Sequence, residues 1–207
     1  ITQWDWADPT AYLHDLVSTD RRDPTVNAYG KIYGALENSA DYLPVLDPTA
    51  HTIDQVPVFP EDPNYNPEPQ PNMATSPTWG DEPIWDAATT VHNPMMDADG
   101  RVWITSRARD PGNVPEFCQE GSDHPSAQVM PRGRSGRHLG VYDPSTEIYT
   151  PINTCFGTHH LMFAEDADNT LWTSGGGSVV GWLNTREFLE TGDAVAAQGW
   201  TPFILDT

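Results

Sequence analysis

Four of the seven histidines accompany short apolar stretches that recur along the chain. His14 lies within YLHDLV, His92 opens HNPMMD, and His159 and His160 open HHLMFAED. Imidazole titrates near neutral pH and is a common metal ligand, so histidines brought together in space can serve as acid–base groups or bind a metal ion. The alternative is a structural role, in which each histidine is hydrogen-bonded beneath a loop. The residues alone leave both interpretations open.

Cationic side chains are rare in this chain and concentrated in one segment. The sequence has 10 Lys and Arg against 30 Asp and Glu. Six of the ten lie in or beside residues 107–136: Arg101, Arg107, Arg109, Arg132, Arg134 and Arg137. A guanidinium group binds carboxylates and other anions through paired hydrogen bonds. The five arginines from Arg107 to Arg137 are therefore candidates for binding an anionic ligand, or they pair with the protein's own carboxylates.

The two cysteines, Cys118 and Cys155, are the only sulfur atoms able to form a cross-link. An even count in a secreted chain favours a disulfide, which would connect the arginine-containing segment to the last third of the chain. Two buried free thiols are a second possibility. A metal site shared with His124, His159 or His160 is a third, although the short Cys-x-x-Cys spacing typical of zinc is absent.

Charge and the N-terminal residues bear on partners and location. The formal net charge is −20 at pH 7, a field that repels nucleic acid and anionic lipid. No run of about 18 apolar residues is present, so no membrane span is expected. The chain begins at Ile1 without a basic and then apolar leader. We expect a processed N-terminus and a secreted or periplasmic protein.

A unit that occurs three times must position these side chains. It reads YGKIYG at Tyr29–Gly34, DGRVWITS at Asp99–Ser106 and DNTLWTS at Asp168–Ser174, with turn residues 70 and 69 positions apart. Two units continue into a second half that contains Asp-Pro-Thr or Asp-Pro-Ser. Each repeat then holds four strands, which is one β-propeller blade. We predict an all-β fold of four-stranded antiparallel blades, about three in this chain, with long insertions and an incomplete ring.

The predicted strands carry specific expectations for burial and register. Residues 31–36, 101–106 and 170–174 are predicted to be equivalent strands, with Tyr33, Trp103 and Trp172 buried between sheets. Counted from the turns, His92 aligns with Leu161, one position away from His160. A bulge would be needed to bring the two histidines to the same face. Residues 185–197 form the one convincing helical segment, with Thr185 as its N-cap.

The repeats divide the chain into four parts. Residues 1–60 hold a lead-in and the first blade, and residues 61–89 form a proline-rich connector or arm. Residues 90–153 hold the second blade, interrupted by the arginine- and cysteine-containing insertion at 107–136. Residues 154–207 hold the third blade. Because propellers contain about 4–8 blades, we expect the rest of the ring to come from another polypeptide or from residues outside this sequence.

The segments HNPMMDADGRVWITS and HHLMFAEDADNTLWTSGGG resemble blades of the streptogramin lyase (virginiamycin B lyase-like) propellers. The resemblance covers about residues 90–177 well and 12–58 weakly. It implies a seven-bladed ring, a divalent metal ion and lyase chemistry in which a histidine acts as base. By position at the blade entry, it points to His92 and His160 as catalytic residues.

Two functions are consistent with these features. The first is a secreted propeller enzyme, lyase-like or lactonase-like, with His92 and His160 as catalytic groups and His14 and His159 as ligands of a divalent metal such as Ca²⁺, Mg²⁺ or Zn²⁺. The second is a non-catalytic extracellular propeller that binds a ligand or partner or takes part in a structural assembly.

Overall fold

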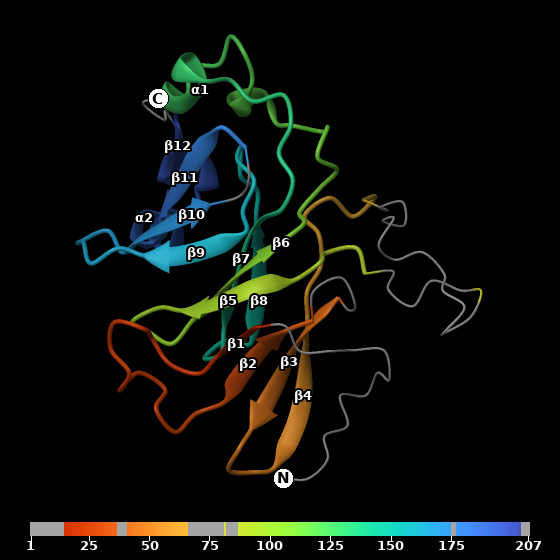
Figure 1. Cartoon of the computed structure of the whole chain (residues 1–207), viewed down its shortest axis with the longest axis vertical. Helices are drawn as coiled ribbons and strands as arrows, with labels where there is room; N and C mark the ends of the chain where they lie inside the picture. Colours follow the sequence, from red (N-terminus) through yellow and green to blue (C-terminus); the bar gives the residue numbers. More distant parts are fainter. Residues whose placement is uncertain (1–14, 37–40, 66–80, 82–86, 175–176, 204–207) are drawn as a thin grey trace.

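The computed structural model describes residues 15–36, 41–65, 81, 87–174 and 177–203. These residues form three antiparallel sheets of four strands each, stacked along the long axis of the molecule (Figure 1). Each sheet is built from strands that are consecutive in the chain, as in propeller blades. We call the sheets blade 1, blade 2 and blade 3. The fold is therefore all-β and propeller-like, with an open rather than a closed arrangement of blades.

The strands follow the predicted repeats. Blade 1 contains β1 (Asp15–Val17), β2 (Ile32–Ala35), β3 (Tyr42–Asp47) and β4 (Thr52–Pro57). Blade 2 contains β5 (His92–Met96), β6 (Val102–Ser106), β7 (His138–Asp143) and β8 (Ile148–Ile152). Blade 3 contains β9 (His160–Phe163), β10 (Thr170–Ser174), β11 (Val179–Asn184) and β12 (Gln198–Pro202). The three predicted equivalent strands are β2, β6 and β10, so that prediction is confirmed.

The repeated aspartates form the turns between strands. Asp97 Oδ1 accepts hydrogen bonds from the backbone N–H groups of Asp99 and Arg101, both at 2.9 Å, and Gly100 has φ of 82°. Glycine adopts this left-handed conformation without the steric cost that a Cβ brings. Asp143 Oδ1 makes the matching turn of the Asp-Pro-Ser unit, accepting from Ser145 N at 2.8 Å. The aspartates therefore serve as turn residues.

Aromatic side chains of one sheet pack on the next sheet. Tyr33 and Trp103 occupy equivalent positions, and both are buried. The Trp103 ring meets Phe163 and Phe188 edge-on, with centroids 6.2 and 6.5 Å apart, and its Nε1 donates to Asp97 Oδ2 at 2.9 Å. The prediction that the third equivalent, Trp172, is also buried is wrong, because its side of β10 faces away from blade 2. The residue is 41% exposed.

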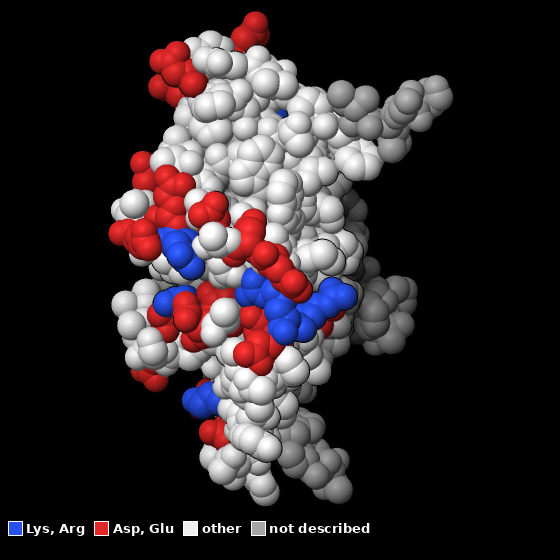
Figure 2. All heavy atoms as spheres, turned by 90° about the vertical axis from the view of Figure 1, so that its left-hand side faces the viewer, with Lys and Arg blue, Asp and Glu red and all other residues white. Residues whose placement is uncertain are grey.

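The connection between β1 and β2 ties blade 1 to blade 3. Arg22 pairs with Asp20 at 2.8 Å, and its Nη1 also donates to Ala164 O at 2.9 Å and Asn169 Oδ1 at 2.6 Å. Figure 2 shows acidic and basic side chains side by side on this face of the molecule. Strand-end turns thus place cations among the surplus carboxylates, where they offset the mutual repulsion.

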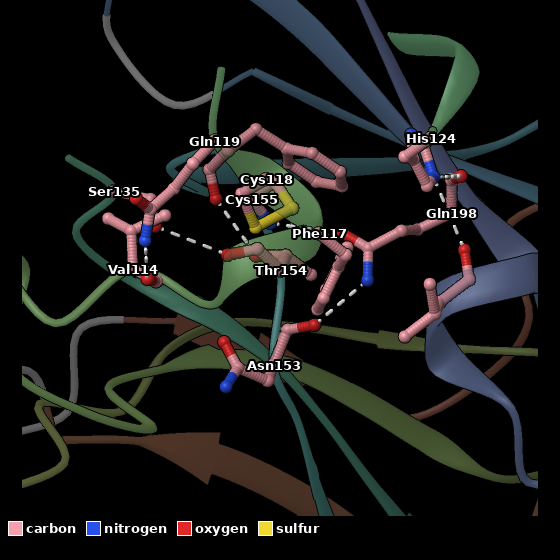
Figure 3. The surroundings of a disulfide bond; sticks show 12 residues. Val114, Phe117, Cys118, Gln119, His124, Ser135, Asn153, Thr154, Cys155 and Gln198 are labelled. Atoms are coloured by element: carbon pink, nitrogen blue, oxygen red, sulfur yellow. Dashed lines mark hydrogen bonds between the residues drawn. A yellow bond between two sulfur atoms is a disulfide. The ribbon is translucent and has the colours of Figure 1, made fainter. Parts of the chain in front are cut away.

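The insertion between β6 and β7 is ordered and forms a small core of its own. It contains a 3₁₀ turn at Glu116–Cys118 and the helix α1 (Pro125–Val129). Buried residues of the insertion pack with Trp200 of β12 and Val179 of β11. Cys118 and Cys155 form a disulfide, as predicted, and the insertion is thereby fixed to the segment that enters blade 3 (Figure 3).

The predicted helical segment consists of two short helices, α2 (Thr185–Thr191) and α3 (Ala194–Ala197). The N-cap is Asn184, whose side chain accepts from Glu187 N at 3.0 Å, so the assignment of Thr185 as the cap is wrong. The Thr185 hydroxyl is used elsewhere, donating to Asn169 O at 2.7 Å. Among the residues described, no helix has the length and apolar character needed to cross a membrane.

Candidate functional site

A bulge in β5 determines where the histidines lie. His92 pairs with Thr105 and Met95 with Trp103, so three steps on β5 oppose two on β6. Asn93, inside this irregular stretch, has φ of 47°. An extra residue turns the following side chains to the opposite face of a strand. The bulge thus compensates for the one-residue difference in register between His92 and His160 that was counted in the sequence.

Three residues, one on the first strand of each blade, consequently occupy equivalent positions along their strands, which we call one level. His92 pairs with Thr105, His160 with Ser174, and Asp15 with Ala35, and these partners hold the same place in β6, β10 and β2. The first strand of each blade lines the axis of a propeller, so this level is an axial position. Sequence reasoning had identified two of the three positions, and Asp15 is the one it missed.

The side chains at this level are in contact. Asp15 Oδ2 lies 3.2 Å from His92 Nδ1. The ring centroids of His92 and His159 are 4.6 Å apart, those of His159 and His160 are 4.2 Å apart, and those of His92 and His160 are 6.4 Å apart. His92 is buried, with 1% of its surface exposed, while His159 and His160 are exposed. We call Asp15, His92, His159 and His160 the axial cluster.

Asn93, at the bulge, orients one imidazole of the cluster. Its Oδ1 accepts from the backbone N–H of Leu161 at 3.1 Å, and its Nδ2 lies 3.2 Å from His160 Nδ1. Since the first bond fixes the amide orientation, Nδ2 is the donor and His160 Nδ1 the acceptor. Neutral His160 therefore carries its proton on Nε2, an assignment that follows from the hydrogen-bond network. Nothing in the spacing of the repeats pointed to Asn93.

The axial cluster does not fit a metal ion as it stands. Within the described part of the chain, no group of three or more His, Cys, Asp or Glu side chains is arranged to hold one. His92 Nδ1 already faces Asp15, and His160 Nδ1 already accepts from Asn93. His14, the other predicted ligand, lies outside the described residues, so the metal site involving His14 and His159 stays a prediction.

The insertion leaves the sheet at the same end as the axial cluster, because Thr105 pairs with His92 and Ser106 with His138. Its packed core, however, lies on the outer strands of blade 3. The Gln198 side chain of β12 binds the backbone beside the disulfide. It accepts from Cys155 N and donates to Asn153 O, both at 3.0 Å (Figure 3).

The five candidate arginines occupy different environments. Arg109 is 3% exposed and donates to Asn153 Oδ1 at 2.8 Å, Ser135 Oγ at 2.6 Å and Thr154 O at 3.0 Å. Burial lowers the pKa of Arg109 to about 10, which leaves it charged at neutral pH. Arg107, Arg132 and Arg137 are half-buried, and Arg134 is exposed. Arg109 thus makes internal bonds, and anion binding by these residues stays a prediction.

His138, which the sequence did not single out, is a structural histidine. It is fully buried, and its Nδ1 lies 3.1 Å from Thr154 O and 3.2 Å from Thr154 Oγ1. Burial, together with the positive charge of Arg109, lowers the pKa of His138 to about 3. The ring is therefore neutral in the folded protein over the whole ordinary pH range.

A pH dependence of stability follows for His138. The folded-state pKa lies below the unfolded value of about 6.5, so the unfolded chain takes up the proton first as the pH falls. The stabilisation that the neutral His138 ring contributes is complete above about pH 6.5. It is lost toward pH 3, at about 1.4 kcal/mol of unfolding free energy per pH unit. Urea unfolding at several pH values should show this slope, and a His138→Gln variant should show a slope flatter by about that amount. Equal slopes in both proteins would contradict the assignment.

Comparisons with known proteins find distant similarity to solved structures. No family model matches the chain, and no curated protein matches it. One similar solved structure is PorZ, an essential bacterial surface component of the type-IX secretion system of Porphyromonas gingivalis, with 11% identity and a TM-score of 0.45. The match covers 91% of this chain and 20% of PorZ.

A second similar structure is a chain of the Mitotic Checkpoint Complex, with 11% identity, a TM-score of 0.38, and coverage of 85% of this chain and 39% of that one. This chain therefore spans well under half the length of either protein. The propeller-like assignment rests on the three sheets themselves, and the resemblance to streptogramin lyases stays a prediction.

Proposed function

We propose that this chain contributes the axial site of an extracytoplasmic propeller enzyme, lyase-like or lactonase-like, that performs acid–base chemistry. The observation that carries the proposal is the convergence of Asp15, His92 and His160 at one level of three first strands, with His159 between the two other rings. A bulge with a residue at positive φ produces this convergence, and local strain of this kind concentrates at functional sites. The disulfide supports an oxidising compartment.

The two ends of the axial cluster suit different roles. His160 presents an N–H hydrogen-bond donor at Nε2, because its Nδ1 accepts from Asn93. At the other end, Asp15 Oδ2 lies 3.2 Å from His92 Nδ1, and the exposed His159 ring packs beside the His92 ring. We assign the exposed His159 as the proton acceptor and His160 Nε2–H as a hydrogen-bond donor. Because His92 is buried, a substrate touches His159 and His160, and Asp15 and His92 position these rings from beneath.

Such a pair of groups is what an elimination from an ester requires. The C–H bond next to the carbon that bears oxygen breaks, and His159 takes its proton. The electron pair forms a carbon–carbon double bond, the C–O bond breaks, and the carboxylate departs as an anion that accepts a hydrogen bond from His160 Nε2–H. A lactonase-like reaction would instead use His159 to activate water.

A non-catalytic propeller is the second candidate function. Arg109, one of the predicted anion-binding residues, bonds only to internal groups in the contacts described, and His92 is almost fully buried. If both residues have structural roles, the propeller serves instead as a surface for binding or assembly.

A comparison of His159→Gln with a control histidine tests the enzymatic proposal. With a panel of cyclic and linear esters, His159→Gln should lower kcat/KM by about 10²–10⁴-fold, the usual contribution of a general base. The matched control is His51→Asn, in an exposed turn at φ of 59°, a conformation that asparagine tolerates, and it should leave turnover unchanged.

Labelled water separates the two reaction types, because elimination leaves no solvent oxygen in the products and hydrolysis does. If turnover is the same in wild type, His159→Gln and His160→Gln, the axial cluster is not the site. If the wild type turns over none of the esters, the non-catalytic function is favoured.

A further inference from the structure

The outer face of blade 3 carries an apolar row that repeats a buried row of blade 2. In blade 2, Trp103 pairs with Met95 on one side and Val141 on the other. In blade 3, Trp172 pairs in the same way with Met162 and Trp182. The first row packs on blade 3, against Leu161, Phe163, Leu171 and Leu183 among others. The second row is exposed at Met162 (55%) and Trp172 (41%).

The exposed row forms an apolar surface, which we call the platform. The Trp172 and Trp182 rings have centroids 5.5 Å apart. Trp182 lies over Gly199, because a Cβ at that glycine would come within 2.3 Å of its ring. The cross-strand neighbours on this face, Ser174 and Val180, are uncharged in a chain of net charge −20. A surface of this composition is typical of the core of a protein interface.

Blade 1 carries the complementary kind of face at the other end of the chain. In blades 2 and 3, the face that receives the aromatic row presents the apolar cross-strand pairs Val102–Tyr142 and Leu171–Leu183. The equivalent pair in blade 1 is Ile32–Leu46, which is half-buried. Leu16 of β1, on the same face opposite Gly34, is 59% exposed. Blades 1 and 3 lie at opposite ends of the molecule (Figure 1).

We propose that the platform of Met162, Trp172 and Trp182 docks on the Ile32–Leu46 face of a second copy of this chain. Each contact would repeat the packing that already joins the blades within one chain. Closed propellers contain about 4–8 blades, and two copies of the three sheets formed by the described residues give six. The contact is head-to-tail, and two such contacts related by a two-fold axis close the ring.

The second copy also completes the surroundings of the axial cluster. His160 is on the edge strand β9, level with Ser174, next to the exposed platform. In the closed ring, the first strands of the partner line the same axis. This inference goes beyond the proposed function and does not depend on it, because association can be measured without any activity.

The oligomeric state tests the proposal. Sedimentation equilibrium of the wild-type chain should give twice the 22.9 kDa mass of one copy. It should be run at about 0.5 M salt, where a Debye length of a few ångström screens the repulsion between the acidic copies. Trp172→Arg on the platform and Leu16→Asp on the receiving face should each weaken association by about 30-fold or more, as expected for an interface hot spot. Val129→Asp on α1, an exposed apolar site away from both faces, is the control and should have no effect.

Mixing the two single variants distinguishes a head-to-tail contact from a symmetric one. A Trp172→Arg copy keeps its receiving face and a Leu16→Asp copy keeps its platform, so the mixture should regain one intact contact and form heterodimers. A wild-type chain that stays monomeric at every soluble concentration overturns the proposal, and the platform is then left for a blade of another polypeptide. A wild-type dimer that both variants leave unchanged, or a mixture that does not associate, also overturns it.

Discussion

Replacing Trp103 with alanine is expected to lower the free energy of unfolding by about 3–5 kcal/mol, the range for a large core aromatic truncated to a methyl group. Trp103 is fully buried between blades 2 and 3, where its ring contacts Phe163 and Phe188. The substitution also removes the hydrogen bond from Nε1 to Asp97 Oδ2, and Asp97 is itself buried. Both losses act on the contact that holds the two blades together.

Chemical denaturation of the two proteins measures the difference, and the chain supplies its own control. Trp172 occupies the same position in blade 3 but is exposed, so Trp172→Ala should cost about 1 kcal/mol or less. This comparison belongs at concentrations where the chain is monomeric, because Trp172 is also part of the proposed interface. Similar losses from both substitutions would contradict the assignment of Trp103 to a blade–blade core.

Loss of the Cys118–Cys155 disulfide is expected to lower the free energy of unfolding by about 3–4 kcal/mol. The two residues are 37 positions apart, and the cross-link limits the freedom of the unfolded chain between them. A double Cys118→Ser and Cys155→Ser variant removes the link without a reductant. Its unfolding midpoint, compared with that of the wild type, gives the effect.

The disulfide also predicts which part of the chain its removal destabilises most. The insertion packs with Trp200 and Val179 through a small cluster that contains both cysteines. Hydrogen exchange in residues 114–130 should therefore increase more than exchange in β6 or β7 when the link is removed. The prediction fails if a thiol titration of the non-reduced, denatured wild type finds two free cysteines.

The repeat in the sequence determined the architecture. Turn residues such as Gly100 and Asn169 interrupt the chain at a constant spacing, and the strands between them have the length and composition of blade strands. Both features are local, so they can be read without knowledge of the fold. The pairing of two cysteines was predictable for a related reason, since only one pair is possible.

Burial of the aromatic positions could not be read in the same way. Tyr33, Trp103 and Trp172 are alike in the sequence, yet two are buried and the third is exposed. Burial depends on whether another sheet lies beside the strand, and that is a property of the whole arrangement. The N-cap at Asn184 shows the same limit at smaller scale, because neighbouring polar residues compete for the cap and the backbone geometry decides between them.

The sequence indicated only some members of the axial cluster. The histidines drew attention by their type and by their place before each turn, but counting residues put His92 out of register with His160. Only the backbone bulge at Asn93 brings His92, His160 and Asp15 to one level, and Asn93 then orients His160 by a side-chain hydrogen bond. A bulge depends on how two strands pair across space. The sequence thus determined the repeat, the turns and the chemistry available on the first strands. The tertiary structure decided which of those groups meet, because strand register and the neighbours of each sheet are set by contacts between residues far apart in the chain.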